Sequence, residues 1–320
     1  MELVPRKRFE MYSGRCHPDL AEEIARHLGV SLGNPNLKSY PNGEVYCRYD
    51  ESVRGADVFI IQTHADQVNR SIMEQCIMID AARRASAKRI TAVCPYYGYS
   101  RQDRKAAGRE PITARLVADM LAVAGADRMV SVDLHSGQIQ GFFNGPVDHL
   151  TAMPVLVGYL AESGPPDPVV VTPDEGRAKV ATRVALHLDA DRAFVHKRRA
   201  GGRVETLGLT GDVAGRNCVL IDDMIDTAGT MCAAAEILVE HGASAVWAMA
   251  THAVLSDPAT DRLKNSAISR IVVTNTVPVP PEKQLENLEV LSVARIIADA
   301  LDAVFEDTSV SEIFGGENQA

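Results

Sequence analysis

Residues 219–230 read V-L-I-D-D-M-I-D-T-A-G-T, a stretch that indicates the fold of the whole chain. Its three branched apolar residues, 219–221, predict a short buried strand. Two carboxylates follow, then a turn of small residues, and helical periodicity begins at Thr230. This order is typical of open α/β sheets, which bind ligands at the carboxyl ends of their parallel strands.

The polar groups of this stretch predict a site for a sugar phosphate. The turn consists of Asp226, Thr227, Ala228, Gly229 and Thr230. Backbone N–H groups of a turn that opens a helix suit a phosphate. Asp222 and Asp223 repel a phosphate, so we expect them to meet ribose hydroxyls or Mg²⁺. A plain helix N-cap is the simpler alternative, but the density of polar groups favours an anion and sugar site.

Composition narrows the class of protein. The chain has 320 residues, enough for two domains, and its 46% apolar and 23% charged residues are typical of a globular protein. Its net charge of −9 argues against a general nucleic-acid binder. The cysteines form no C-x-x-C pair, and we interpret them as reduced thiols in a cytoplasmic protein. No apolar run is long enough to span a membrane.

Strand and helix patterns alternate along both halves of the chain, which predicts an α/β fold with mostly parallel sheets flanked by helices. The predicted strands are 57–62, 90–95, 129–135, 169–171, 193–196, 219–221, 246–251 and 271–275. The predicted helices are 19–28, 69–85, 113–124, 178–188, 230–241 and 293–305.

The two halves match at one fixed offset, which indicates a duplicated domain. Thr113 and Thr230 each open a predicted helix and lie 117 positions apart, as do His135 and His252, which end the strands that follow. We therefore predict domains at 1–152 and 153–314, followed by a polar tail, 315–320.

The equivalent connections of the two copies differ in charge. The second copy uses the short acidic turn described above, whereas the first has a long loop, 95–112, that is rich in cations and tyrosines. Its cations are Arg101, Arg104, Lys105 and Arg109. Guanidinium groups bind phosphates bidentately and aromatic rings stack on bases, so this basic arm suits a nucleotide; a solvated surface loop is the alternative.

Two further features suit a polyphosphate. His135 and Asp174 follow buried strands, where they could share a Mg²⁺ that is held mainly by phosphate oxygens and water, although imidazole is an unusual Mg²⁺ ligand. Lys197 and Arg199 lie in a basic segment followed by glycines, which suits a mobile flap over a polyanion. With no nucleophile motif recognisable, the pattern favours phosphoryl-type transfer by positioning and charge neutralisation.

From about residue 9 to 314, the chain resembles the ribose-phosphate diphosphokinase (phosphoribosyl pyrophosphate synthetase) family. The motifs that carry the resemblance are N-G-E at 42–44, Y-S-R-Q-D-R-K at 99–105, D-L-H-S-G-Q-I-Q-G-F-F at 133–143, P-D-E-G at 173–176, H-K-R-R at 196–199 and I-D-D-M-I-D-T-A-G-T at 221–230. The resemblance implies two phosphoribosyltransferase-like domains. It also implies the Mg²⁺-dependent conversion of ATP and ribose 5-phosphate into phosphoribosyl pyrophosphate and AMP.

Site residues follow from the resemblance, motif by motif. ATP would be bound by Asn42, Gly43, Glu44, Arg101, Gln102, Asp103 and His135, the first three from a neighbouring subunit. The metal would lie at His135 and Asp174. Lys197 and Arg199 would be catalytic, and ribose 5-phosphate would be bound by Arg199, Asp222, Asp223, Asp226, Thr227, Ala228, Gly229 and Thr230. One departure is Arg177, which stands where many members of the family have glycine.

The resemblance also implies regulation and assembly. An allosteric phosphate site would comprise Ser52, Arg54, Ser86, Ser309 and Ser311, in a cytoplasmic homohexamer built from dimers and activated by inorganic phosphate. Two alternatives are a phosphoribosyltransferase, which shares the 222–230 type of site, and a non-catalytic regulatory homologue. The basic arm argues against the first, and the presence of Lys197 and Asp222 argues against the second.

Overall fold

The structure is a computed structural model that describes residues 7–173, 178–200 and 203–314. The chain forms two compact units. The first comprises Met1–Thr151, Thr276–Pro278 and Ala294–Ala320, and the second comprises Ala152–Asn275 and Val279–Val293. Within the described part of the chain, no helix combines the length and the apolar character that a membrane span needs.

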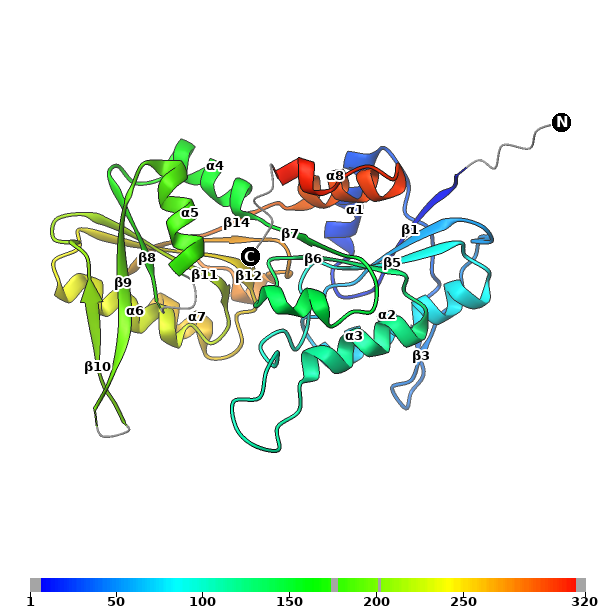
Figure 1. Ribbon diagram of the computed structural model, residues 1–320, viewed down its shortest axis with the longest axis horizontal. Helices are drawn as coiled ribbons and strands as arrows, with labels where there is room; N and C mark the ends of the chain where they lie inside the picture. The colour runs from blue at the N-terminus through cyan, green and yellow to red at the C-terminus, as the bar shows by residue number, and fades with distance from the viewer. Residues whose placement is uncertain (1–6, 174–177, 201–202, 315–320) are drawn as a thin grey trace. The chain divides into compact units, whose positions relative to one another are not determined.

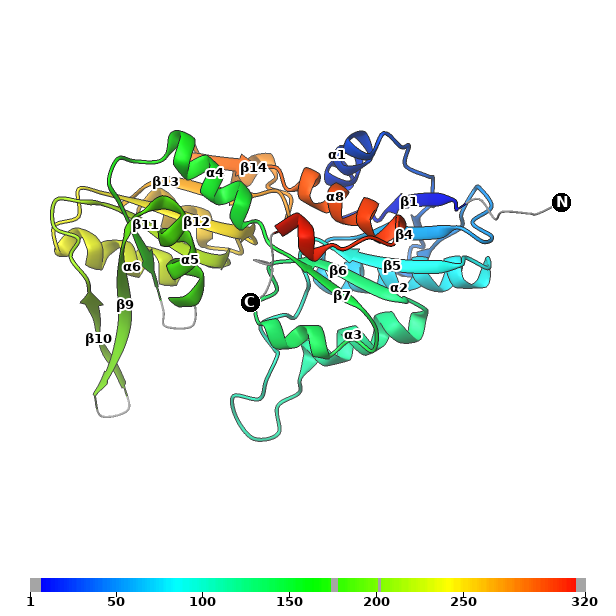
Figure 2. The same ribbon diagram turned by 45° about the horizontal axis from the view of Figure 1, so that its top comes forward.

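The first unit is built on a parallel sheet of five strands in the order β1-β4-β5-β6-β7. These strands are β1 Phe9–Ser13, β4 Asp57–Ile61, β5 Arg89–Cys94, β6 Arg128–Val132 and β7 Val147–Leu150. The unit also has α1 Pro18–Leu28, α2 Val68–Arg84, α3 Thr113–Ala124, α8 Ala294–Phe305, the short hairpin β2 Lys38–Ser39 and β3 Val45–Tyr46, and the 3₁₀ turns η1 Gly137–Gly141 and η4 Ser311–Phe314. Helices α1 and α8 cover one face of the sheet, and α2 and α3 cover the other (Figures 1 and 2).

The second unit contains seven strands in the order β10-β9-β8-β11-β12-β13-β14, parallel except for the antiparallel pair β9–β10. These strands are β8 Pro168–Thr172, β9 Asp191–Ala200, β10 Arg203–Thr210, β11 Asn217–Ile225, β12 Ala245–Ala253, β13 Ile268–Thr274 and β14 Leu288–Leu291. Its helices are α4 Met153–Ser163, α5 Ala178–Leu188, α6 Gly229–Glu240, α7 Ala259–Lys264 and the 3₁₀ turn η3 Pro281–Lys283. The predicted α/β class, with mostly parallel sheets flanked by helices, is confirmed.

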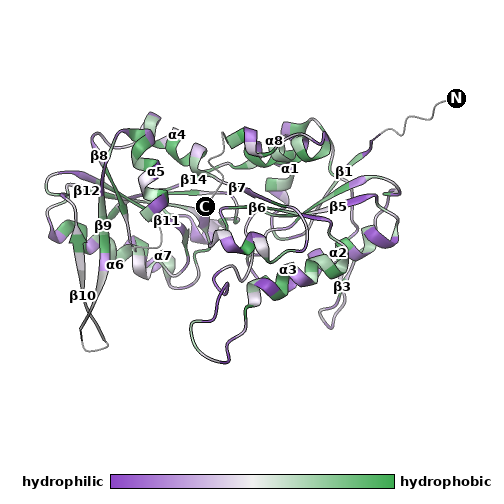
Figure 3. Ribbon diagram, in the orientation of Figure 1, coloured by the Kyte–Doolittle hydropathy of each residue, from purple (hydrophilic) through white to green (hydrophobic). Residues whose placement is uncertain are grey.

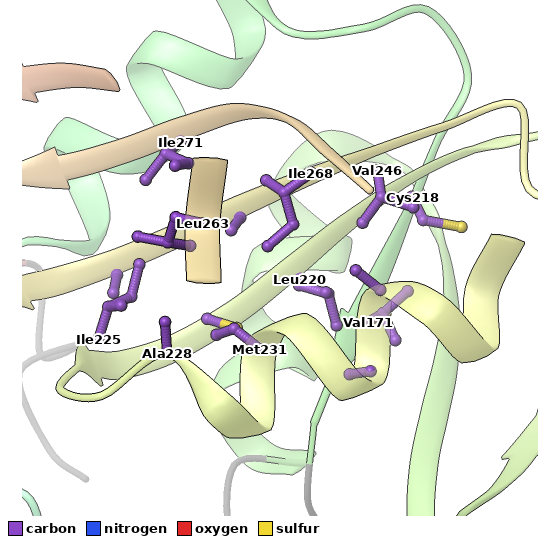
Figure 4. Close-up of a cluster of buried hydrophobic side chains, with 14 of the residues drawn as sticks. Val171, Cys218, Leu220, Ile225, Ala228, Met231, Val246, Leu263, Ile268 and Ile271 are labelled. Carbon is purple, nitrogen blue, oxygen red and sulfur yellow. The ribbon is translucent and has the colours of Figure 1, made fainter. Parts of the chain in front are cut away.

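Each unit has its own apolar core between sheet and helices. In the second unit, Leu220 of β11, Met231 of α6 and Ile271 of β13 are at most 2% exposed and belong to one cluster (Figure 4). Burying one such side chain contributes roughly 1.5–3 kcal/mol, so the cluster fixes α6 against the end of β11. That packing positions the turn between these two elements.

The repeat predicted from the sequence is present as a shared order of strands and helices, with one exception. Strands β5-β6-β7 and β11-β12-β13 have the same order, and α3 and α6 each contain twelve residues. The histidines at the same offset, however, are not equivalent. Strand β12 continues past the length of β6, so His252 lies on a strand and is 2% exposed, whereas His135 follows the end of β6.

The predicted boundary of the second domain at residue 314 differs from the observed division, because α8 packs on α1 in the first unit. Ile297, Leu301 and Val304 form the buried stripe of α8. The Phe305 ring meets Phe9 edge-on at 5.3 Å between centroids. The apolar face of α8 therefore completes the cover of the first sheet, a long-range contact that sequence order does not indicate.

Candidate functional site

The acidic pair lies within strand β11, which continues past the predicted end at 221. Strand β12 pairs with β11 as far as Ile225, whereas β8 ends its pairing opposite Leu220. This extra pairing on one side extends the strand through Asp222 and Asp223. Asp223 is 6% exposed and Asp222 is half-buried. The two carboxylates therefore lie at the carboxyl end of the sheet, where the neighbouring strand β8 no longer pairs with β11.

The turn after β11 presents backbone donors. Ala228 has left-handed geometry, with φ 60° and ψ 0°, and its carbonyl accepts the N–H of Cys232 as α6 begins. The N–H groups of Gly229, Thr230 and Met231 open the helix, where no intrahelical acceptor exists. These donors lie six to eight residues beyond Asp223, and with the positive end of the helix dipole they can receive an anion.

Arg262 of α7 is a residue that the sequence reasoning missed. Its Nη1 donates to the carbonyl oxygen of Thr227 at 2.9 Å. A Cβ added to Gly229 would lie 3.3 Å from the same nitrogen, so the glycine allows this close approach. Because a trans peptide is planar, a Thr227 carbonyl held towards Arg262 directs the N–H of Ala228 the opposite way. The arginine thus orients a peptide of the turn from behind.

The basic segment predicted as a flap forms part of a two-stranded ribbon, β9–β10, seen in Figure 1. In this ribbon Lys197 pairs with Leu207 and Arg199 with Val204, and the register shifts between Val204 and Thr206. Lys197 and Arg199 are two positions apart on β9. Their side chains lie outside the described part of the structure, as do Asp174 and Arg177 in full.

The basic arm between β5 and α3 is anchored at both ends. Gln102 caps α3, because its carbonyl accepts the N–H of Ala114 and its Oε1 accepts the Thr113 hydroxyl at 2.6 Å. Asp103 is 9% exposed and accepts a hydrogen bond from Gln138 at 2.7 Å. The Asp103 carboxylate therefore ties the arm to the loop after β6, while Arg101 is exposed on a largely hydrophilic loop (Figure 3).

His135 lies in the loop after β6, which also provides Gln138. The loop begins at Asp133, whose φ is 37°, and the N–H of Leu134 donates to His149 at 2.9 Å. His135 itself is half-buried. Among the described residues, no group of three or more His, Cys, Asp or Glu side chains could hold a metal. The expected Mg²⁺ would arrive bound to phosphates and would need only one or two protein ligands.

The Asn42–Glu44 motif forms the exposed tip of the β2–β3 hairpin. The side chain of Asn42 accepts the N–H of Glu44 at 3.2 Å, and Gly43 has φ 92°, which favours glycine. An open pocket lies between the hairpin and α2, lined by Tyr40, Glu44 and Met73 among others. All three residues of the motif are exposed, as a contact surface would require.

The five residues of the expected allosteric site all belong to the first unit. The N–H of Gly55, next to Arg54, donates to the carbonyl of Ser86 at 2.8 Å. Arg89 forms ion pairs with Asp57 and Asp307, which joins this turn to the segment after α8. Ser52 lies in the same loop as Arg54, and Ser309 and Ser311 follow Asp307; all four are exposed.

Comparisons with known proteins match nearly the whole chain. A family model described as the N-terminal domain of ribose phosphate pyrophosphokinase matches residues 9–125, and one described as a phosphoribosyl synthetase-associated domain matches residues 168–315. The ribose-phosphate pyrophosphokinase of Streptomyces avermitilis is 54% identical over 312 residues, 96% of each chain. That of Mycobacterium tuberculosis is 50% identical over 317 residues, 98% of this chain and 97% of the relative. The crystal structure of phosphoribosylpyrophosphate synthetase from Mycobacterium smegmatis is 50% identical with a TM-score of 0.90, covering 94% of this chain and all of that one.

Proposed function

Because the chain belongs to the ribose-phosphate pyrophosphokinase family and is an enzyme, we propose that it transfers the β,γ-diphosphoryl group of ATP to ribose 5-phosphate. The products are phosphoribosyl pyrophosphate and AMP, and the reaction supplies nucleotide biosynthesis. The observation that carries this proposal is the β11–α6 connection, where two carboxylates are followed, after a short turn, by the donors of a helix N-terminus. That order matches a ligand with vicinal hydroxyls at one end and a phosphate at the other.

In the second unit, each part of the connection has a distinct role towards ribose 5-phosphate. Asp222 and Asp223 accept hydrogen bonds from the ribose hydroxyls, which donate to carboxylates. The turn Asp226, Thr227, Ala228, Gly229 and Thr230 receives the 5-phosphate through N–H and hydroxyl groups. Arg262 supports the turn and adds positive charge beside the phosphate. This arrangement leaves the C1 hydroxyl as the reacting end of the sugar.

In the first unit, the basic arm, the β6 loop and the hairpin tip serve ATP. Arg101 and Gln102 contact the nucleotide from the arm, and Asp103 contributes by fixing the arm to Gln138. Asn42, Gly43 and Glu44 contact the adenine of a neighbouring subunit, which suits their outward position on the hairpin. His135 lies beside the triphosphate.

The reaction is a direct displacement at phosphorus. The C1 hydroxyl oxygen attacks the β-phosphorus of ATP in line, and a new O–P bond forms as the hydroxyl proton is released. The bond from the β-phosphorus to the oxygen that bridges it to the α-phosphorus breaks, and AMP leaves with the electron pair. Lys197 and Arg199 neutralise the charge that the transferred group carries, with Arg199 also contacting the sugar phosphate, and positioning supplies much of the rate.

Mg²⁺ is the metal that we propose, with His135 and Asp174 as the residues that would hold it together with phosphate oxygens. It would neutralise the triphosphate and so make the β-phosphorus accessible to a hydroxyl. No further protein ligand is needed, because Mg²⁺ keeps several waters in such sites.

We further propose that inorganic phosphate activates the enzyme at Ser52, Arg54, Ser86, Ser309 and Ser311, in a homohexamer built from dimers. The backbone hydrogen bond from Gly55, next to Arg54, to Ser86 supports a site at which these two residues act together. The nearby ion pairs would hold the loops in place when phosphate binds.

The deciding experiment is an assay of AMP release from ATP and ribose 5-phosphate, with and without Mg²⁺ and with and without inorganic phosphate. Release of AMP that needs both substrates and the metal supports the proposal. Formation of a nucleoside 5′-monophosphate and pyrophosphate from phosphoribosyl pyrophosphate and a base would instead identify a phosphoribosyltransferase. Binding of both substrates without turnover, in the full chain with phosphate present, would identify a non-catalytic regulatory homologue.

A further inference from the structure

His64 is completely buried in the loop that joins β4 to α2, although no step of the proposed reaction uses it. Its Nδ1 accepts the backbone N–H of Gly98 at 3.1 Å. Its own backbone N–H donates to the carbonyl of Tyr96 at 3.0 Å. His64 therefore contacts the start of the basic arm through both its backbone and its ring.

The other ring nitrogen of His64 is fixed by Gln75 of α2. Nε2 lies 2.8 Å from the Oε1 of Gln75. The amide nitrogen of Gln75 donates to the carbonyls of Ile60 on β4 and Val93 on β5, at 3.1 and 3.3 Å, so its oxygen must face the ring. Nε2 is consequently the protonated nitrogen, and Nδ1 is left as an acceptor for Gly98.

The packing around Gly98 leaves almost no freedom for the arm to shift. A Cβ added to Gly98 would lie 2.8 Å from the Cβ of His64 and 2.9 Å from Val68. Tyr99 then turns the chain with φ 61°, and its carbonyl accepts the N–H of Gln102. A continuous series of contacts thus runs from the sheet through His64 to the residues of the arm.

The surroundings keep the ring neutral. Burial lowers the pKa of His64 to about 4, against the opposing effect of the Gln75 hydrogen bond. The other titratable groups that face this site are the Cys94 thiol, which also donates to Gln75, and the Tyr97 ring, 5.8 Å away between centroids. Burial raises the pKa of the Cys94 thiol to about 12, and the pKa of Tyr97 is raised as well, so both groups are uncharged near neutral pH.

We infer that His64 is a positioning residue for the nucleotide, acting through the Gly98 N–H to set where Arg101 and Gln102 reach ATP. This inference rests on the proposed function, because it concerns the ATP half of that reaction. The contacts that run from the sheet through His64 to Gly98 would thereby position the ATP-binding residues of the arm.

Two matched substitutions separate the bond to the arm from the bond to Gln75. In His64→Asn the amide oxygen takes the place of Nδ1 and keeps an acceptor for Gly98. In His64→Gln the amide takes the place of Nε2 and keeps the bond to Gln75 but leaves Gly98 without its acceptor. We expect His64→Gln to raise KM for ATP about three- to tenfold, the effect of one lost hydrogen bond, with KM for ribose 5-phosphate unchanged. We expect His64→Asn to stay close to the wild-type value.

Hydrogen exchange gives a readout that does not depend on activity. The Gly98 amide and the following amides of the arm should exchange faster in His64→Gln than in His64→Asn. The core variant Ile79→Val on α2 controls for general loss of stability, because Ile79 is buried and makes no bond to the arm.

The outcomes distinguish this inference from the proposed function. If the wild-type protein releases no AMP, the proposed function fails, and the exchange difference alone still shows whether His64 holds the arm. If the wild-type protein is active but His64→Gln and His64→Asn have equal KM values for ATP and equal exchange, His64 is not a positioning residue. Equal increases of KM for both substrates would show a purely structural role.

Discussion

Arg262 donates a hydrogen bond to the carbonyl oxygen of Thr227 at 2.9 Å, although the two residues are 35 positions apart. The contact joins helix α7 to the turn that opens α6. It thereby places a guanidinium immediately beside Gly229, a residue of the proposed 5-phosphate site.

Replacing Arg262 with Ala should raise KM for ribose 5-phosphate about ten- to a hundredfold, since a charged hydrogen bond contributes about 1.5–3 kcal/mol. KM for ATP should change little. Arg262→Lys should lie between the wild type and Arg262→Ala, because it keeps the charge but lacks the planar fork. Lys264→Ala is the matched control, an exposed cation on the same helix. A sugar-phosphate KM unaffected by Arg262→Ala, measured in steady-state assays, would exclude this role.

Gly98→Ala should destabilise the protein by about 1–3 kcal/mol, because the new methyl group meets the Cβ of His64 and a methyl of Val68. The measurement is chemical denaturation followed by circular dichroism. Gly108→Ala in the same arm is the control, since a Cβ added there has no neighbour within 4 Å. Equal stability of the two variants would contradict the close packing of Gly98.

Stability should fall as the pH is lowered from about 6.5 to about 4, because His64 is neutral in the fold. Its pKa is about 4 in the folded protein against an ordinary value of 6.5, so the unfolded chain binds the extra proton in this window. The loss from this group amounts to roughly 3 kcal/mol, at 1.36 kcal/mol per pKa unit. Unfolding midpoints of wild type and His64→Gln should converge at low pH; parallel curves would show that His64 is not the group responsible.

Lys197→Ala should lower kcat far more than it weakens binding of ribose 5-phosphate, because the proposed flap neutralises charge only as the diphosphoryl group is transferred. Turnover by AMP release and sugar-phosphate affinity by calorimetry give the two quantities. Lys283→Ala, outside the proposed site, is the control. An unchanged kcat together with weaker binding of ribose 5-phosphate would contradict the flap role.

Much of the fold was predictable because it depends on neighbours in sequence. The bounds of α3 and α5 agree with the prediction, since apolar periodicity and a following glycine or turn define a helix locally. Strand β11 was predicted too short, because Asp222 and Asp223 are poor strand formers in isolation. Their pairing with β12 overrides that preference.

The sequence by itself determined the α/β class, the internal repeat, the family and the order of residues in the 222–230 connection, because each can be recognised from local patterns along the chain. Only the tertiary structure decided that α8 completes the first unit, that Arg262 supports the turn and that His64 holds the arm. These relationships join residues from separate elements. A side chain's partner across the fold depends on how sheets and helices pack, and spacing along the chain does not encode that directly.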